Sequence, residues 1–217
     1  MSKPVTLKEA IKFPLTVVGL MWALHLVKIV FGFHWNKYGI FPREVEGLIG
    51  VLASPFLHSG FKHLLSNSIP LFLMLTLIML FYGKVAKLSF FMIYFLTGFL
   101  VWLLGRHVHH IGASGIVYGL ISFVFWNGVF RKNFKSVVLS IIIVFLYSGY
   151  VAGVLPGQEG ISWESHLLGA LSGMFVSFIL RNVKEEHELQ EFKENAHYED
   201  YEENYFFDRD IFSHKQD

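Results

Sequence analysis

Ser114 stands in a small-residue segment, Gly112-Ala113-Ser114-Gly115, whose composition suits the surroundings of a nucleophile. The apolar run 116–130 follows directly and predicts a helix that starts at the serine. Glycines let backbone approach a ligand closely, and the first turn of a helix offers free N–H groups. A hydroxyl in that setting can attack a carbonyl beside an oxyanion-binding pocket. The alternative is that these small residues only let a membrane helix pack tightly.

A histidine that could activate this serine lies at the head of the last apolar run. His166, Gly169 and Gly173 are spaced i, i+3 and i+7, so they share one face of a helix. Gly115 and Gly119 form a matching stripe after the serine. Close contact between the two stripes would bring the imidazole to the hydroxyl. The alternative is a histidine that only packs between helices.

A third polar helix start is His63-Leu-Leu-Ser-Asn67. His63 and Asn67 are four residues apart, so they lie on one helical face, and both can donate hydrogen bonds. An interhelical hydrogen bond is the alternative role for Asn67, and space filling is the alternative for Tyr118, one turn after the serine. Polar groups inside a bilayer are costly, so three polar helix starts on one side of the membrane predict a functional site.

Several other chemistries are excluded by composition. The chain has no cysteine, which removes thiol nucleophiles, disulfides and cysteine metal sites. No His-Glu-x-x-His motif is present, so we expect no metal and no cofactor. Every aspartate lies near the C-terminus, so an aspartyl pair in the membrane and a triad completed by Asp are both excluded: Asp200, Asp208, Asp210 and Asp217. We find no nucleic-acid-binding module.

The chain as a whole predicts an all-α membrane protein. Of its 217 residues 53% are hydrophobic and 16% are charged, and the mean hydropathy is +0.48. Six apolar segments have about the length that crosses a bilayer. They are residues 13–33, 62–82, 88–104, 114–130, 135–155 and 165–180. The mixed segment 34–61 predicts a structured loop with short interfacial helices.

Charge distribution predicts the orientation. Ten Lys and Arg residues fall on the side of the membrane that holds the N-terminus, and four fall on the other side. We therefore expect both termini in the cytoplasm and the serine facing outward. The predicted parts are a cytoplasmic N-terminus, 1–12, a membrane domain, 13–181, and an acidic cytoplasmic tail, 182–217. Lys28 interrupts the first span, and we expect its ammonium to reach an interface.

The three polar helix starts together resemble the rhomboid family of intramembrane serine proteases. The family's serine motif is similar to Gly112-Ala113-Ser114-Gly115 with Tyr118, its histidine helix to His166-x-x-Gly169-x-x-x-Gly173, and its oxyanion residues to His63-x-x-x-Asn67. The resemblance implies a bundle of six transmembrane helices over about residues 13–181. One departure is Ile49-Gly50, which stand where the family often carries Trp-Arg.

The resemblance also implies roles. Ser114 would be the nucleophile and His166 the general base, His63 and Asn67 would hold the oxyanion, and Tyr118 would pack on the base. Supporting roles would fall to the glycines Gly112, Gly169 and Gly173.

The implied function is endoproteolysis of transmembrane segments by a Ser-His dyad, with membrane proteins as substrates and the lipid bilayer as surroundings. We expect a multi-pass protein of a bacterial plasma membrane. Oligomeric state is left open by the sequence. Two alternatives are a non-enzymatic rhomboid-like protein that binds membrane clients, and a small transporter that relays protons through His63, His109 and His166.

Overall fold

The computed structural model of the chain describes residues 5–157, 160–185 and 188–189. The chain divides into two compact units, Val5–Val183 and a second that joins Met1–Pro4 to Lys184–Asp217. Most of the second unit, including nearly all of the predicted acidic tail 182–217, lies outside the described residues. The first unit, which we call the helical body, carries every candidate site residue.

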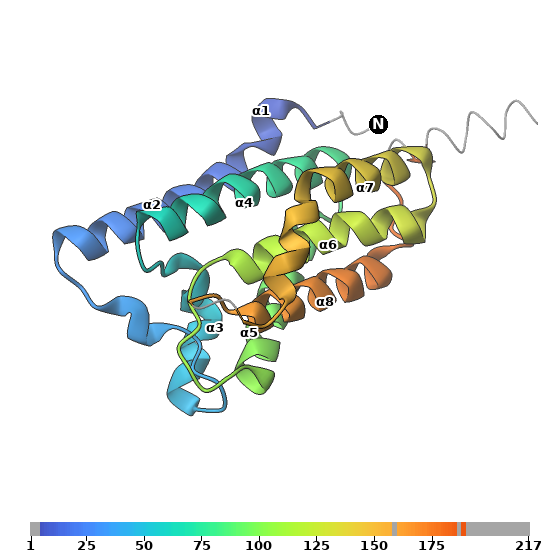
Figure 1. Cartoon of the computed structure of the whole chain (residues 1–217). Coiled ribbons are helices and arrows are strands. Elements are labelled where there is room, and N and C mark those ends of the chain that lie inside the picture. The colour runs from blue at the N-terminus through green and yellow to red at the C-terminus, as the bar shows by residue number, and fades with distance from the viewer. Residues whose placement is uncertain (1–4, 158–159, 186–187, 190–217) are drawn as a thin grey trace, which may run out of the picture. The chain divides into compact units, whose positions relative to one another are not determined.

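The helical body is built of helices and loops (Figure 1). Among the described residues there is no β-strand, only an isolated antiparallel bridge between Ile40 and His110. The α-helices are α1 (Leu7–Ala10), α2 (Lys12–Val30), α3 (Ile49–Ala53), α4 (Phe61–Phe81), α5 (Ala86–Leu104), α6 (Ser114–Arg131), α7 (Phe134–Tyr147) and α8 (Trp163–Leu180). The 3-10 helices are η1 (Trp35–Tyr38), η2 (Val45–Leu48), η3 (Ser54–Phe56) and η4 (Ser148–Val154).

The described residues include five helical segments long and apolar enough to cross a membrane. They are Leu7–Val30, Phe61–Phe81, Ala86–Leu104, Phe134–Val154 and Trp163–Leu180. The expected fourth span forms helix α6 but is not among the five. Asn127 and Arg131 lower its hydropathy, and α6 tolerates them because more than half of its residues are buried by protein rather than lipid. Six crossings and cytoplasmic termini stay predictions.

Two helix ends differ from the predicted spans, and glycine accounts for both. The first span was expected to reach residue 33, but α2 ends at Val30, and Gly32 then takes a left-handed φ of +67°. The fifth span was expected to stay helical to residue 155, but α7 ends at Tyr147 and the chain continues as the 3-10 helix η4. Gly149 and Gly153 lie in η4 and lower the preference for an α-helix.

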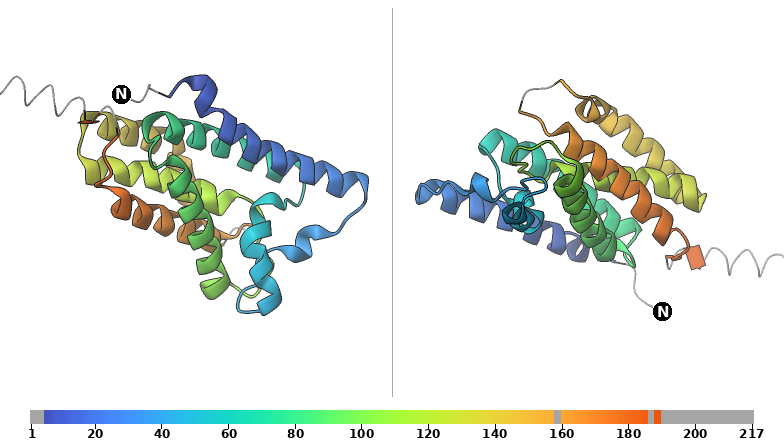
Figure 2. Two further views of the ribbon diagram at one scale, coloured as in Figure 1. Left: turned by 180° about the vertical axis from the view of Figure 1, so that it is seen from behind. Right: turned by 90° about the horizontal axis from the view of Figure 1, so that it is seen from below.

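Helix α6 is the centre of the bundle. It packs against α4, α5, α7 and most extensively α8, whereas α2 packs mainly on α4 (Figures 1 and 2). Large side chains of α6 are fully buried among these neighbours, including Leu120 and Phe123. The helix that begins at Ser114 is therefore held by four neighbouring helices.

Glycines bring α6 and α8 into backbone contact. A Cβ atom at Gly169 would collide with the carbonyl oxygen of Gly115, and one at Gly173 would collide with that of Gly119. The hydroxyl of Ser122 adds a hydrogen bond of 2.6 Å to the carbonyl of Ala170. The two stripes of small residues thus meet as the sequence predicts.

The connection between α2 and α4 contains short helices, as predicted, and side chains fasten it to the bundle. Lys28, in the last turn of α2, makes one of these attachments. Its ammonium donates to the carbonyl of His58 at 2.7 Å and to Asn36 Oδ1 at 3.0 Å, because these oxygens lie within reach of α2. Arg43 donates to the carbonyl of Gly105 at 2.8 Å, which ties the connection to the end of α5.

We expect the variant Gly173→Ala to destabilise the bundle. Its methyl group would meet backbone atoms of α6 that cannot move without separating the helices, and such overpacking typically costs about 1–3 kcal/mol. The control is Gly19→Ala in α2, where no atom lies within 4 Å of the added methyl group. Thermal unfolding of the two purified proteins in the same detergent measures the difference. Equal unfolding temperatures would contradict the packing described.

Candidate active site

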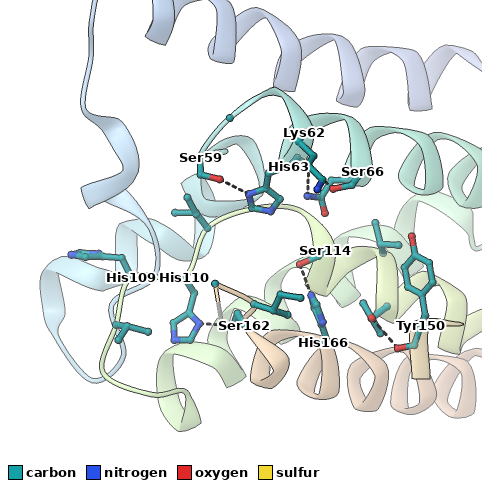
Figure 3. A pocket seen from close by; sticks show the side chains of 18 of the residues that line it. Ser59, Lys62, His63, Ser66, His109, His110, Ser114, Tyr150, Ser162 and His166 are labelled. Carbon is teal, nitrogen blue, oxygen red and sulfur yellow. Dashed lines mark hydrogen bonds between the residues drawn. The ribbon is translucent and has the colours of Figure 1, made fainter. Parts of the chain in front are cut away.

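Ser114 is the first residue of α6, and its hydroxyl meets the imidazole of His166 in the first turn of α8. The distance from Ser114 Oγ to His166 Nε2 is 2.8 Å (Figure 3). No side chain caps α6, because its N-cap residue is Ala113. The first N–H groups of α6 therefore have no capping side chain as a partner, as an anion-binding site requires.

The second ring nitrogen of His166 fixes which tautomer is present. Nδ1 lies 2.8 Å from the carbonyl oxygen of Gly153, in η4. A carbonyl only accepts, so Nδ1 must carry the proton, and Nε2 is left as the acceptor for the hydroxyl of Ser114. This is the tautomer that a general base needs. No sequence pattern indicates this partner, because every residue has a backbone carbonyl and the sequence does not show which one lies near the histidine.

Tyr118 packs flat on the ring of His166. The two rings are stacked with centroids 4.1 Å apart and planes 10° apart. The hydroxyl of Tyr118 donates to the carbonyl of Tyr150 at 2.9 Å. Segment η4 therefore supports the histidine twice, through Gly153 directly and through Tyr150 by way of Tyr118.

A cavity of about 1010 Å³ opens onto these groups. The residues lining it include His63, Asn67, Ser114, Tyr118 and His166. The structure thus brings the three predicted polar helix starts to one cavity (Figure 3). Gly169 and Gly173 do not line it, and they lie deeper, where α8 contacts α6.

His63 and Asn67 form one wall of the cavity, close to Gly112. His63 Nδ1 lies 3.2 Å from the hydroxyl of Ser59, and a hydroxyl that donates there leaves the N–H on Nε2. Asn67 donates one of its two amide N–H groups to the carbonyl of His63 at 2.8 Å. Each side chain can therefore offer a further N–H donor toward the cavity.

Gly112 allows this wall to come close. Its φ of +102° is a conformation that L side chains rarely adopt, and an added Cβ would lie 2.6 Å from His63 Nε2. Its N–H donates to the carbonyl of Ser54 at 2.8 Å, which anchors this segment to η3. The glycine is needed here for both conformation and space.

His58 is a buried neighbour of this wall that no sequence pattern indicates. Its ring packs edge-on against that of His63, with centroids 5.0 Å apart, and the residue has no exposed surface. Burial, and then the nearby His63, lower the pKa of His58 to about 4. It is therefore neutral at pH 7 and supports His63 by packing.

A second polar cluster lies at the edge of the cavity. Glu164 does not orient His166. It forms an ion pair with Arg106, from the loop between α5 and α6, and the hydrogen bond to this carboxylate raises the pKa of the Arg106 guanidinium. His110, in the same loop, contacts Ser162 Oγ at 2.6 Å, and burial lowers its pKa.

We expect Gly112→Ala to reduce the reactivity of Ser114 toward a fluorophosphonate by about tenfold or more, because shifts of about 1 Å at a reacting pair can cost up to 10²-fold. The methyl group would strain the backbone and push His63 away. The matched control is Gly60→Ala, also at the cavity, where no atom lies within 4 Å of the added methyl group. Intact-protein mass spectrometry measures the labelling rates of the two variants. Equal rates would contradict the prediction that a methyl group at position 112 disturbs the site.

Comparisons with known proteins identify a family and several relatives. The family model described as Rhomboid domain matches residues 45–183. An uncharacterized protein of Mycobacterium tuberculosis (strain ATCC 25618 / H37Rv) is 34% identical over 180 residues, which cover 76% of this chain and 73% of that protein. An uncharacterized protein of Mycobacterium leprae is 31% identical over 180 residues, or 76% and 69% of the two chains. "Putative rhomboid protease YdcA" of Bacillus subtilis (strain 168) is 30% identical over 135 residues, or 59% and 65%.

Proposed function

Because the chain belongs to the rhomboid family, a family of intramembrane proteases, we propose that it is a serine endopeptidase that cleaves transmembrane segments with Ser114 and His166. The single observation that carries the proposal is the contact of 2.8 Å between Ser114 Oγ and His166 Nε2, two residues that line the cavity together with His63 and Asn67. Peptide hydrolysis needs a nucleophile, a base in the correct tautomer and access for water, and these groups supply all three.

In the proposed reaction, His166 Nε2 takes the proton of Ser114 as Oγ attacks the carbonyl carbon of the substrate. The negative charge that develops on the carbonyl oxygen is held by the N–H of Ser114 together with the further N–H donors of His63 and Asn67. His166 then gives its proton to the leaving amine, and an acyl-enzyme forms on Ser114. Water from the cavity, activated by the same histidine, releases the second product.

The carbonyl of Gly153 takes part of the role that a carboxylate has in a Ser-His-Asp triad. It holds the ring orientation and the tautomer of His166. It carries no full negative charge, so it stabilises the imidazolium less than a carboxylate would. The stacked ring of Tyr118 keeps the same imidazole from rotating away between catalytic steps.

The protein is a multi-pass membrane protein of this family. We propose its substrates, its membrane and its orientation as follows, the orientation from the charge pattern. The substrates would be proteins with a transmembrane segment that enters the cavity from the bilayer. The membrane would be a bacterial plasma membrane, with both termini in the cytoplasm and the cavity open to the outside.

Neither alternative is favoured by a specific contact. A proton relay would need its three histidines joined in a chain. His109 instead stacks on Phe41, with ring centroids 4.6 Å apart, while His63 contacts Ser59 and His166 is engaged by Ser114 and Gly153. A client-binding protein without activity would not depend on these contacts, so substitution separates it from an enzyme.

We expect a fluorophosphonate to label the purified protein at Ser114, and Ser114→Ala to lose both labelling and cleavage of a reporter transmembrane segment. Peptide mapping by mass spectrometry identifies the labelled residue. The control is Ser66→Ala, which removes another hydroxyl that lines the same cavity and should leave both signals intact. Cleavage by Ser114→Ala at the parental rate would exclude the proposed enzyme.

We expect Asn67→Ala to slow cleavage without abolishing it. Losing one oxyanion donor costs about 10²–10³ in kcat in a soluble serine protease. The fall should be in kcat rather than KM, because the donor acts on charge that develops in the transition state. Steady-state cleavage of the reporter in detergent measures both constants, and a change confined to KM would instead assign Asn67 to substrate binding.

A further inference from the structure

Four residues at the edge of the cavity join the segment before Ser114 to the start of α8. Arg106 and His110 lie in the loop that leads into α6, while Ser162 and Glu164 lie at the start of α8. Arg106 forms an ion pair with Glu164, and one guanidinium nitrogen, Nη2, donates to Glu164 Oε2 at 3.1 Å. We call these four residues the rim clamp.

His110 closes the clamp through both ring nitrogens. Nε2 lies 2.9 Å from the carbonyl of Arg106, so it carries the proton, and Nδ1 accepts from the hydroxyl of Ser162 at 2.6 Å. Ser162 is also the N-cap of α8, and its hydroxyl oxygen accepts from the N–H of Ser165. One buried imidazole, 3% exposed, thus connects the loop backbone to the cap of the helix that carries His166.

Burial of Glu164 makes the ion pair sensitive to loss of Arg106. The side chain of Glu164 is only 7% exposed, whereas that of Arg106 is 55% exposed. A carboxylate left without its cation in such a place is strongly unfavourable, and movement of the start of α8 toward water would relieve this cost. Glu164 stands two residues before His166, and such a movement would displace the base.

We propose that the rim clamp positions the catalytic pair, with Arg106 and Glu164 as positioning residues that set the distance between Ser114 and His166. The contact between Gly115 and Gly169 fixes the two helices one turn inside the site, and the clamp fixes the two segments outside it. The hydroxyl and the imidazole are therefore held from both ends. This inference rests on the proposed proteolytic function, because it assigns the clamp a role in that reaction.

The first test is kinetic and uses Arg106→Gln and Glu164→Gln in the full chain. A displacement of about 1 Å can cost up to 10²-fold in rate, so we expect kcat to fall by about tenfold to a hundredfold with KM nearly unchanged. The double variant should lose little more than either single one, because both break one interaction. The charge-swapped Arg106→Glu/Glu164→Arg protein should recover part of kcat. Arg181→Gln is the control, since Arg181 donates to a carbonyl of its own helix, that of Phe178.

The second test does not depend on proteolysis. The chain has no cysteine, so Val108→Cys and Leu167→Cys, both at exposed positions, place one spin label on the loop and one on α8. We expect a narrow distance distribution by pulsed electron paramagnetic resonance in the otherwise parental protein and in Ser114→Ala. A broader or shifted distribution is expected once Arg106 or Glu164 is replaced.

The outcomes separate the two claims. Parental kcat in both single variants, or losses that multiply in the double variant, would overturn the clamp while leaving the protease assignment in place. An unchanged distance distribution would overturn it as well. A parental protein that neither cleaves the reporter nor reacts with the fluorophosphonate would overturn the proposed function, and a distribution that still broadens would then assign the clamp a structural role only.

Discussion

The close approach of α6 and α8 is the constraint on which the site depends. Gly115 and Gly119 face Gly169 and Gly173 with no side chain between the two backbones. Ser114 and His166 stand at the same end of this contact, so the separation of the helices sets the separation of hydroxyl and imidazole. Within a bilayer, such small-residue contacts hold helices together by van der Waals packing, because lipid is as apolar as the side chains it would replace.

His166 is oriented by backbone rather than by a carboxylate, and the bilayer gives a physical reason. An unpaired carboxylate buried beside His166 would be costly, whereas a carbonyl is neutral and already part of the chain. The change from α-helix to 3-10 helix after Tyr147 brings the carbonyls of Tyr150 and Gly153 to Tyr118 and His166. The carboxylate of Glu164 is held at the rim by Arg106, where part of the pair reaches solvent.

The sequence predicted the helices and the side chains that meet in the site. It predicted few of the contacts that backbone carbonyls make. The apolar runs predicted the helices to within a few residues, except where Gly32 and the η4 glycines ended them early. The spacing of His166, Gly169 and Gly173 predicted the contact that places the imidazole. The carbonyl of Gly153 has no side-chain signature, and the pair of Arg106 with Glu164 spans 58 residues of chain, so no local pattern reveals either. Helix α6 can carry Asn127 and Arg131 and be less apolar than a lipid-exposed span, because more than half of its residues are buried by protein.

Membership of the rhomboid family favours proteolysis, but some proteins with a rhomboid fold have no activity. The proposal of an active protease must therefore rest on the geometry of the site. A protein that only binds clients needs a groove and apolar contact surface. It has no use for a histidine whose tautomer is fixed so that Nε2 accepts, for an uncapped helix start at the serine, or for a glycine at φ +102° that leaves room for His63. The uncapped helix start leaves N–H groups without a capping side chain, and none of these features is required for tight packing. Their convergence on one hydroxyl is what a nucleophile requires, which is why hydrolysis accounts for the cavity better than binding does.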